Sequence, residues 1–315
     1  MSHITDLENI HLLRPSVVTI GVFDGVHRGH QHLIRSLVDE AHQNNRLAVV
    51  LTFFPHPDVV IRGITDRYYL TTAEQRAQLL LDLGVDYVVT HPFNAQTRQI
   101  RAGDFVDLLI RHLKINELWV GADFALGYKR EGNVVFLTEA GKTRNFSVHV
   151  VDMVQTASMG QTISSTLIRE LLSQGKVEKV ADLLGRSYRV SGTVIEGKKR
   201  GRTLGFPTAN MAVWDQQLIP MNGVYAGWAT LGDERFMAMT NIGVSPTFDN
   251  PTVTVEPYLL DFDRDIYGET MELSFERFLR PEAKFNGLDA LVAQIQKDVD
   301  TGRALLSAMA KNAQP

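Results

Sequence analysis

The stretch VVTIGVFDGVHRGHQHLIRSLVDEA, residues 17–41, decides the fold of the first half of the chain. Its first four residues are apolar, which is typical of a buried strand, and apolar residues recur at helical spacing from Leu33 onward. Between them three glycines allow the backbone a tight path close to a ligand. These are Gly21, Gly25 and Gly29. The stretch therefore predicts a strand, a glycine-rich turn and a helix, in that order.

The start of this helix is a candidate phosphate site. A helix that begins after such a turn aims free backbone N–H groups at whatever lies in front of it, which favours a phosphate. His27 and His30 stand three residues apart, so they can share a face and donate hydrogen bonds to one anion. No Gly-Lys-Ser/Thr follows, which excludes a Walker A loop. Spacing alone leaves an ordinary glycine turn with two surface histidines equally open.

The composition is that of an ordinary globular protein. At 315 residues the chain is long enough for about two domains. Its hydrophobic content of 44% and charged content of 22% are typical of soluble proteins. The net charge of -4 gives no signature of nucleic-acid binding. The absence of cysteine excludes disulfides, cysteine–zinc sites and thiol nucleophiles.

The N-terminal residues and the hydropathy of the chain bear on its location. Residues 1–16 contain no apolar core of a signal peptide, and no stretch of the sequence is apolar for long enough to span a membrane. We therefore expect a cytoplasmic protein without membrane or nucleic-acid partners. We expect it to be a monomer or a weak homo-oligomer.

Strand and helix patterns alternate through the first half of the chain. Apolar runs predict strands, and amphipathic stretches between them predict helices. The predicted strands are 47–53, 87–90, 118–121 and 147–151, and the predicted helices are 71–83, opened by a capping box at 71–74, and 103–113. The motif Phe-Pro-His-Pro at 54–57 predicts a rigid loop at the end of a strand. This alternation predicts a Rossmann-like parallel sheet.

Two further polar features fall where such a sheet binds ligands. Asp123 directly follows a predicted strand, at the edge where open α/β sheets hold their ligands, although an aspartate there also caps turns. The motif ISSTLIR, residues 163–169, places three hydroxyls at a helix start, where capping also accounts for them. Arg169 adds a guanidinium to the first turns, where it could meet a triphosphate together with the hydroxyls.

The pattern changes after a short amphipathic helix at residues 177–184, which ends at Gly185. From Tyr188 onward, apolar and polar residues alternate in segments broken by glycine and proline. This pattern predicts an antiparallel barrel or sandwich, followed by a final amphipathic helix from Leu288. We therefore predict two domains, residues 1–184 and 185–315.

The most informative stretch of the second half is GKKRGRTLGFPTAN, residues 197–210. Its basic residues could gather phosphates without a Walker loop, or simply form a solvated charged loop. Thr208 and Asn210 could offer oxygen ligands to Mg²⁺, which prefers hard ligands and keeps several waters. Residues alone leave both interpretations open.

Several motifs, taken together and in order, resemble one known family. The core His27-x-x-His30 with its glycine resembles the signature of the nucleotidyltransferase superfamily. The motifs FDGVHRGHQ, FPHP, ISSTLIR and LGFPTAN together resemble the bacterial bifunctional riboflavin kinase/FAD synthetase family. The resemblance covers residues 15–305. It implies an N-terminal Rossmann-like nucleotidyltransferase domain and a C-terminal antiparallel riboflavin-kinase barrel with a terminal helix.

The resemblance also implies two reactions on one chain. The C-terminal domain would phosphorylate riboflavin with ATP to give FMN. The N-terminal domain would then adenylylate FMN with a second ATP to give FAD and pyrophosphate. Mg²⁺ would accompany ATP, and the partners would be the small molecules riboflavin, FMN and ATP. Alternatives are a kinase with an inactive first domain, a non-catalytic flavin-binding regulator, and adenylyl transfer to another acceptor.

The family motifs assign roles to particular positions of this chain. As catalytic residues the resemblance implies Glu256, His27, His30 and Arg169. As residues that bind ATP or phosphate it implies Gly21, Phe23, Asp24, Gly25, Gly29, Asp123, Ser164, Ser165, Thr166, Lys198, Arg202 and Gly205. As flavin contacts it implies His56 and Pro207, and as metal ligands Thr208 and Asn210. Pro257 directly follows Glu256, so we expect an extended backbone there with one donor fewer for the strand ladder.

Overall fold

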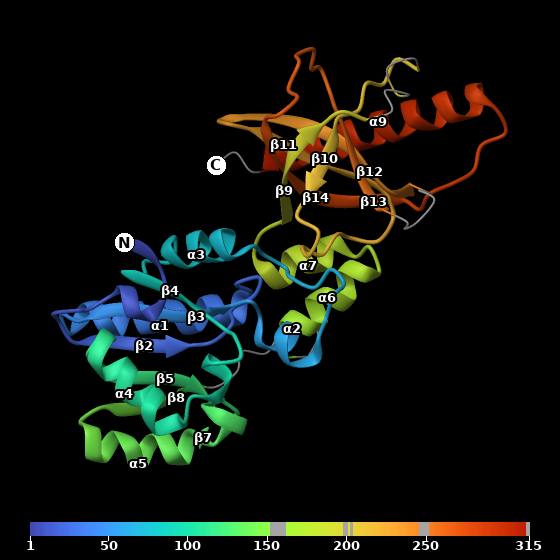
Figure 1. Ribbon diagram of the computed structural model, residues 1–315. Coiled ribbons are helices and arrows are strands. Elements are labelled where there is room, and N and C mark those ends of the chain that lie inside the picture. Colours follow the sequence, from blue (N-terminus) through green and yellow to red (C-terminus); the bar gives the residue numbers. More distant parts are fainter. Residues whose placement is uncertain (152–161, 198–200, 202–203, 246–251, 313–315) are drawn as a thin grey trace. The chain divides into compact units, whose positions relative to one another are not determined.

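A computed structural model describes the chain except for residues 152–161, 198–200, 202–203, 246–251 and 313–315 (Figure 1). The chain divides into two compact units, Met1–Ser165 and Thr166–Pro315. We describe each unit by itself. The division of functional domains after residue 184 stays a prediction.

The first unit is built on a six-stranded sheet in the order β1-β4-β3-β2-β5-β8. Every neighbouring pair in it is parallel. The strands are β1 Ser2–Thr5, β2 Ser16–Ile20, β3 Leu47–Phe54, β4 Tyr87–Pro92, β5 Ile115–Gly121 and β8 Ser147–Val151. The strand order reverses between β2 and β5, and such a switch point is where open α/β sheets bind ligands. The predicted Rossmann-like sheet is confirmed.

Helices cover both faces of this sheet. They are α1 Arg28–Gln43, α3 Ala73–Leu81, α4 Ala102–Leu113 and α5 Val134–Arg144, while the short helix α2 Pro57–Arg62 follows β3 and has no buried residue. Val17 of β2 packs in one core with α1 and α3, while Val18 packs in a second core with α4 and α5. All five residues of β2 are buried because both faces are covered, and this explains the continuous apolar run in its sequence.

Shorter elements complete the first unit. They are the 3₁₀ turns η1 Leu7–Asn9, η2 Thr97–Gln99 and η3 Tyr128–Arg130, and the small hairpin of β6 Ala125–Leu126 with β7 Gly132–Asn133. The two strands of the hairpin follow β5, at the ligand edge of the sheet. The hairpin connects the loop that contains Asp123 to the start of α5.

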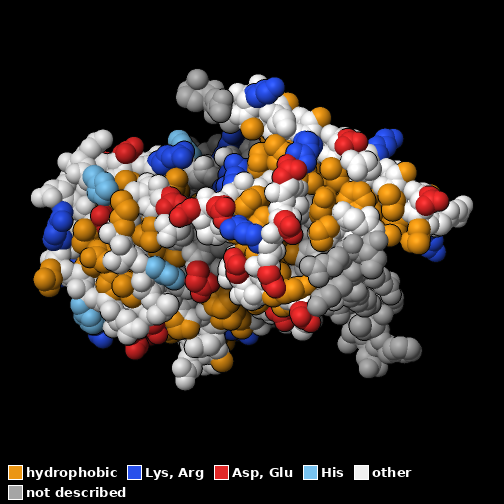
Figure 2. Space-filling view, turned by 90° about the horizontal axis from the view of Figure 1, so that it is seen from above, with side chains coloured by type: hydrophobic (Ala, Val, Ile, Leu, Met, Phe, Trp, Pro, Cys, Tyr) orange, Lys and Arg blue, Asp and Glu red, His pale blue; other side chains and the backbone are white. Residues whose placement is uncertain are grey.

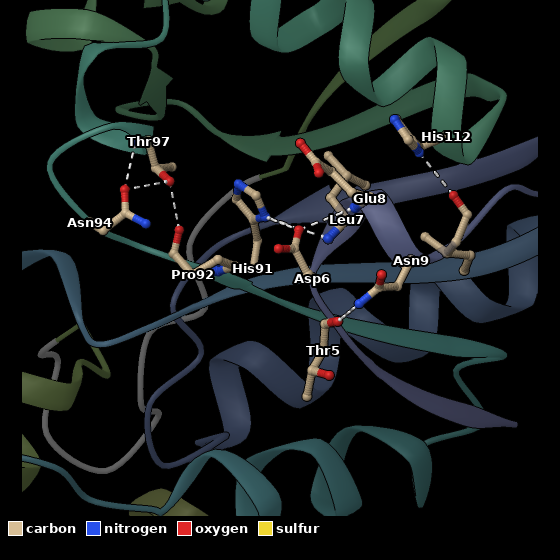
Figure 3. A network of polar contacts seen from close by, with 11 residues as sticks. Thr5, Asp6, Leu7, Glu8, Asn9, His91, Pro92, Asn94, Thr97 and His112 are labelled. Atoms are coloured by element: carbon tan, nitrogen blue, oxygen red, sulfur yellow. Dashed lines mark hydrogen bonds and ion pairs between the residues drawn. The ribbon is translucent and has the colours of Figure 1, made fainter.

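The edge strand β1 was not predicted, because its residues are exposed or only half-buried and its apolar pattern is weak. Polar contacts hold it in place instead (Figure 3). His91 Nδ1 on β4 lies 3.0 Å from Asp6 Oδ1, just after β1. His3 Nε2 on β1 lies 2.9 Å from Thr90 Oγ1 on β4. Asn9 Nδ2 donates to the Thr5 carbonyl at 2.6 Å. The edge of the sheet therefore depends on hydrogen bonds between side chains that lie far apart in sequence.

Two local predictions in this unit need correction. Residues 54–57 were expected to form a rigid loop, yet a helix, α2, begins at Pro57 with His56 as its N-cap. Proline is well tolerated in a first helical turn, because its missing N–H would have no partner there. The capping box of α3 is formed by Thr72 and Gln75, one residue later than expected.

The second unit contains most of α6 Ser165–Ser173, then α7 Val177–Leu184 and a six-stranded antiparallel sheet in the order β10-β9-β14-β11-β12-β13. The strands are β9 Tyr188–Ile195, β10 Asn210–Val213, β11 Gly223–Leu231, β12 Glu234–Ser245, β13 Thr252–Leu259 and β14 Thr270–Arg280. The Ala209 N–H donates to the Pro257 carbonyl at 2.9 Å. This bond joins the two outer strands, so the sheet is a nearly closed barrel, as predicted.

The last helix, α9 Leu288–Asn312, packs on the face of this barrel formed by β11 and β12. Val299 and Leu306 of the helix share a core with Ala226 and Met239. Gly302 permits the close approach, since a Cβ there would overlap the Met239 sulfur. The terminal helix is thereby confirmed, and it is a packed part of the barrel.

The surface gives little sign of a large charged patch on the face that Figure 2 shows, where basic and acidic side chains are interspersed. In the part of the chain that the structure describes, no helix has the length and apolar character needed to cross a membrane.

Candidate functional site

The loop between β2 and α1, residues 21–27, lies at the switch point of the first sheet. Three of its residues have positive φ: Phe23 at 52°, Gly25 at 80° and Val26 at 41°. Positive φ is strained for Phe and Val and persists only where the surroundings determine it. The Phe23 ring folds back over the loop, because a Cβ at Gly21 would lie 2.9 Å from Phe23 Cζ. The 21–27 loop therefore has a strained backbone conformation, which its surroundings must stabilise.

Asp24 is one of the groups that hold the 21–27 loop. Its side chain is buried, with 1% exposure. The carboxylate accepts hydrogen bonds from the backbone N–H of Leu70 at 3.0 Å and of Thr71 at 3.1 Å. The Thr71 hydroxyl donates to it at 3.2 Å. These bonds attach the loop to the segment before α3.

His27 and His30 meet at the start of α1. His27 is the N-cap, and its Nδ1 accepts the His30 backbone N–H at 3.3 Å. Because Nδ1 accepts, the neutral ring carries its proton on Nε2. The two rings are stacked with centroids 3.6 Å apart. A Cβ at Gly29 would lie 3.2 Å from the His27 ring, so glycine permits this close packing.

His30 is a histidine with a lowered pKa and one ring nitrogen that has no partner among the described residues. Burial lowers its pKa well below 6.5, and the nearby charges of His27 and Arg76 lower it further. The imidazole is therefore neutral at pH 7. Its Nδ1 is buried and has no hydrogen-bond partner among the described residues. A buried polar atom without a partner is unusual and fits a site that a ligand completes.

The ISSTLIR motif reaches the same loop from far along the chain. The Ser165 hydroxyl donates to the Asp24 carbonyl at 2.8 Å, across a separation of 141 residues. Ser164 is half-buried beside it, just ahead of α6. Thr166 is exposed, and Arg169 is half-buried one turn further into α6, within the second unit. The structure thus brings Ser165 to the 21–27 loop, while the roles of Thr166 and Arg169 stay predictions.

The other predicted residues of the first unit lie on neighbouring loops. His56 is buried after β3, its Nδ1 accepts the Asp58 N–H at 3.0 Å, and its own backbone N–H donates to the Tyr69 hydroxyl at 2.9 Å. Asp123 is exposed after β5, and Arg130 donates to its carbonyl at 2.8 Å. Both residues lie at the carboxyl edge of the sheet that carries the 21–27 loop.

Sequence reasoning missed two side chains that donate to the Val22 carbonyl of the 21–27 loop. Arg76 of α3 donates from Nη1 to the Val22 carbonyl at 3.0 Å and from Nη2 to the Phe53 carbonyl at 3.1 Å. The Thr52 hydroxyl donates to the same Val22 carbonyl at 2.9 Å. One signal was present: Arg76 occupies a position in the buried stripe of α3, between residues Ala73 and Ala77. An arginine in an apolar stripe needs buried acceptors.

In the second unit the 197–210 loop is shaped by close approaches of its backbone. The Gly201 carbonyl accepts the N–H of Leu204 at 3.0 Å and of Phe206 at 2.9 Å, and Gly205 has a φ of 83°. A Cβ at Gly197 would overlap the Asn210 side-chain amide. Lys198 and Arg202, which were predicted to bind phosphate, lie outside the described residues.

The Ala209–Pro257 hydrogen bond places the end of this loop beside β13. Glu256 is half-buried on β13 and pairs in register with Asn241 of β12. Pro257 lacks a donor, as expected, but its carbonyl accepts the Ala209 N–H at 2.9 Å. The predicted base and the predicted metal ligands, Thr208 and Asn210, therefore belong to adjacent backbone segments. Pro207 itself is exposed.

The described residues contain no cluster of three or more His, Cys, Asp or Glu side chains that could hold a metal ion. The predicted donors Thr208 and Asn210 carry a hydroxyl and an amide oxygen. Such a sparse set of hard oxygen donors suits Mg²⁺, which takes much of its coordination from phosphates and water. A site for a structural metal would need more protein ligands.

Comparison with known proteins covers both units. A family model described as FAD synthetase matches residues 9–167, and one described as riboflavin kinase matches residues 184–306. A bifunctional riboflavin kinase/FMN adenylyltransferase from Listeria monocytogenes is 41% identical over 92% of each chain. The enzyme of that name from Haemophilus influenzae is 37% identical over 98% of this chain and 100% of its own. The one from Escherichia coli K12 is 36% identical over 91% of each.

The fold is matched as well. A crystal structure described as a macrolide-efflux protein from Streptococcus pneumoniae has a TM-score of 0.85 and 29% identity, covering 96% of this chain and 99% of that one. The description as an efflux protein applies to the Streptococcus pneumoniae protein and not to this chain. Matches to both family models favour two activities over a kinase with an inactive first domain or a flavin-binding regulator. The chain belongs to the family of bifunctional riboflavin kinase/FMN adenylyltransferases, which phosphorylate riboflavin to FMN and adenylylate FMN to FAD.

Proposed function

We propose that the two reactions take place at two separate sets of residues, adenylyl transfer at the 21–27 loop and phosphoryl transfer at the 197–210 loop with Glu256. The observation that carries the first assignment is the hydrogen bond from Ser165 to the Asp24 carbonyl. It joins two motifs that are far apart in sequence at the switch point of a parallel sheet. Ligands of such sheets bind there.

In adenylyl transfer, a phosphate oxygen of FMN attacks the α-phosphorus of ATP, and the bond to the departing pyrophosphate breaks. The FMN phosphate is already anionic at neutral pH, so the reaction needs no general base. It needs stabilisation of charge on the α-phosphate and on the leaving group. His27, His30 and Arg169 are the residues that we assign to this task.

The other phosphate contacts are assigned to the backbone and hydroxyls around these residues. Glycines allow phosphate to approach the backbone closely, and hydroxyls donate to phosphate oxygens. Asp24 is given a different role from the one that its motif suggests, because its carboxylate binds protein amides and so shapes the loop. The assigned contacts are Gly21, Phe23, Gly25, Gly29, Ser164, Ser165 and Thr166.

His30 gives the first site a response to its ligand. Burial holds the pKa of its imidazole well below 6.5 in the folded chain. A triphosphate beside the ring would raise that pKa, since an opposite charge nearby favours the protonated form. Binding of ATP would therefore be accompanied by proton uptake where the pH lies between the two values. The resulting imidazolium would donate from both ring nitrogens, including the Nδ1 that has no partner among the described residues.

The flavin of the first site is assigned to the neighbouring loop that carries His56, and Asp123, on the loop after β5, is assigned to the nucleotide. His56 is held firmly, because its ring nitrogen caps α2 and its backbone N–H binds Tyr69. The rings of Tyr68 and Tyr69 lie nearly perpendicular to its ring, in T-shaped contacts. Aromatic side chains of this kind offer the apolar surface on which a flavin ring can lie.

In phosphoryl transfer, the ribityl 5′-hydroxyl of riboflavin attacks the γ-phosphorus of ATP. Glu256 is assigned as the base that accepts the hydroxyl proton, a contribution of roughly a hundredfold or more. Positioning and neutralisation of charge do the remaining work. Lys198, Arg202 and Gly205 are assigned to the phosphates, and Pro207 to the flavin.

Mg²⁺ is assigned to the second site, where Thr208 and Asn210 would contribute oxygen ligands. When bound, the ion neutralises charge on the ATP phosphates. The chain itself positions these donors: a side chain at Gly197 would displace the Asn210 amide, and the barrel closure at Ala209 fixes the backbone between Thr208 and Asn210.

We also propose that the enzyme acts in the cytoplasm as a monomer or a weak homo-oligomer. Its substrates are small molecules, and the net charge of -4 does not favour a nucleic-acid partner. No membrane partner is needed for either reaction.

A time course of the products tests the proposed pair of sites. The purified protein is incubated with riboflavin, ATP and Mg²⁺, and the flavins are separated by chromatography. FMN is expected first and FAD later, and a chelator such as EDTA is expected to stop FMN formation until Mg²⁺ is restored. FMN without any FAD would contradict an active first site, and FMN formation that is indifferent to the chelator would contradict the assigned metal.

A further inference from the structure

Arg76 is a buried arginine that the reactions assigned above do not use. It lies in α3 with 0% exposure, so it touches neither solvent nor substrate. Burying a charge is unfavourable unless hydrogen bonds and nearby charges compensate for it. A protein retains such a group where its hydrogen bonds matter, and the partners of Arg76 therefore indicate what it does.

Those partners are backbone carbonyls at the ligand edge of the sheet. Nη1 donates to Val22 in the 21–27 loop, and Nη2 donates to Phe53 in β3. One guanidinium thereby connects the ends of two adjacent strands. Its planar fork fixes the direction of both bonds, which a single ammonium would not do.

The loop that Arg76 holds is the strained one. The residues that follow Val22 include Phe23 and Val26, both with positive φ. The Val22 carbonyl accepts two hydrogen bonds, one from Arg76 and one from the Thr52 hydroxyl at 2.9 Å. Two donors on one carbonyl, together with the amide bonds to Asp24, supply the restraint that such a backbone needs.

The charge of Arg76 also acts on Asp24 in the loop and on His30 at the start of α1. It attracts the Asp24 carboxylate, which partly offsets the burial of the guanidinium. It also lowers the pKa of His30, as a smaller contribution after burial and the charge of His27. Arg76 therefore helps to keep His30 neutral until an anion binds.

We propose that Arg76 is a positioning residue for adenylyl transfer, which fixes the 21–27 loop through the Val22 and Phe53 carbonyls and thereby places His27 and His30. This inference rests on the assignment of His27 and His30 to that reaction. It concerns a residue that acts through others, since its side chain has no access to the ligand.

The test uses the whole chain, in which riboflavin kinase activity reports on the second unit. Arg76→Met removes both the fork and the charge, and Arg76→Lys retains the charge alone. Arg144→Met, which loses a surface ion pair with Asp107, is the matched control. FAD formation from supplied FMN is measured as kcat/KM, FMN formation from riboflavin as the internal control, and the His30 titration by NMR, with His30→Gln for assignment.

Arg76→Met is expected to lower kcat/KM for FAD formation about a hundredfold, as misplaced reacting groups commonly do. FMN formation is expected to stay unchanged, and the His30 titration to move to higher pH. Arg76→Lys is expected to restore the titration but only part of the rate. Arg144→Met is expected to match the parent protein in all three measurements.

Two results would overturn the proposal. One is FAD formation by Arg76→Met within twofold of the parent rate. The other is a lower rate with an unmoved His30 titration, which would show that Arg76 does not act through the surroundings of His30. If the first unit of Arg76→Met does not fold, Arg76→Lys and Thr52→Val decide, since each removes part of the support of Val22, and normal FAD formation in both overturns the proposal. Normal FAD formation by His30→Ala would instead refute the site assignment on which the inference rests.

Discussion

The two glycine-rich loops of this enzyme are held in different ways. The 21–27 loop is fixed by buried side chains from elsewhere in the chain: Asp24 binds amides before α3, and Arg76 and Thr52 bind the Val22 carbonyl. In the described part of the 197–210 loop, two backbone N–H groups bind the Gly201 carbonyl, and Gly197 makes room for Asn210.

This difference follows from the surroundings of each loop. The first loop leaves a strand that is buried on both faces, so polar groups at its end must find partners inside the protein. The second lies on an outer strand of a barrel, where one backbone bond to Pro257 connects it to the next strand. In this chain the loop at the edge of the parallel sheet is thus held by distant side chains, whereas the described part of the loop at the barrel edge is held by its own backbone contacts.

The comparison predicts the largest effect for Gly197→Ala. The added Cβ would overlap the Asn210 amide and displace a proposed metal ligand. A displacement on the order of 1 Å is expected to lower kcat/KM for FMN formation roughly a hundredfold. Steady-state kinetics with riboflavin measures this, and FAD formation from supplied FMN is expected to be unaffected.

Gly232→Ala is the matched control for this prediction. Gly232 also belongs to the second unit and has a φ of 55°, but a Cβ there would meet nothing within 4 Å. This variant is expected to lose about 1 kcal/mol of stability from backbone strain and no kinase activity. Equal kinase rates in Gly197→Ala and the parent would show that the position of Asn210 is not important.

A smaller effect is expected for Ser165→Ala. It removes the hydrogen bond to the Asp24 carbonyl, which is worth about 1 kcal/mol. FAD formation is expected to fall roughly fivefold, since about 1.4 kcal/mol in the transition state corresponds to a factor of ten. Ser173→Ala, which removes a local bond to the Glu170 carbonyl at the end of the same helix, is expected to change nothing.

An unchanged rate of FAD formation in Ser165→Ala would mean that the contact is only structural and that the ISSTLIR motif acts through other residues. Thermal unfolding of both serine variants would separate the two cases. If Ser165→Ala loses stability but keeps the parent rate of FAD formation, the contact is structural.

The smallest effect concerns pH. His30 has a pKa well below the value near 6.5 that it takes in the unfolded chain. The unfolded state therefore binds more protons than the folded one between these two values, so stability falls as pH decreases from about 6.5 toward the folded pKa. Above that range the contribution is constant.

The check is a series of unfolding temperatures between about pH 5 and pH 7.5 for the parent and for His30→Gln. The glutamine variant cannot charge, so its unfolding temperature is expected to fall less steeply on acidification. Identical slopes in the two proteins would show that His30 is not buried in its neutral form.

The sequence predicted the parallel sheet and the barrel because their signals are strong and local. Residues 17–20 and 47–53 form apolar runs, and both are strands buried on two faces. The helix 177–184 and its terminal Gly185, with a φ of 70°, were found from periodicity and a cap. The edge strand β1 lacked such a signal, because polar side chains that lie far apart in sequence hold it in place.

The motif residues of the candidate site could be predicted from the sequence, but the residues that hold them in place could not. Short patterns revealed His27, His30 and Ser165, which the structure brings to one loop. Arg76 was missed because it acts on backbone carbonyls, which no motif records. The partner of Ala209 could not be predicted either, since the pairing of the two outer strands depends on the closure of the barrel.

The most direct test of two separate sites pairs His30→Ala with Glu256→Ala. His30→Ala is expected to convert riboflavin to FMN at the parent rate and to form no FAD. Glu256→Ala is expected to form no FMN from riboflavin but to adenylylate supplied FMN normally, and a mixture of the two is expected to produce FAD from riboflavin. Loss of both activities in either folded variant, or FAD formation by His30→Ala alone, would contradict the account.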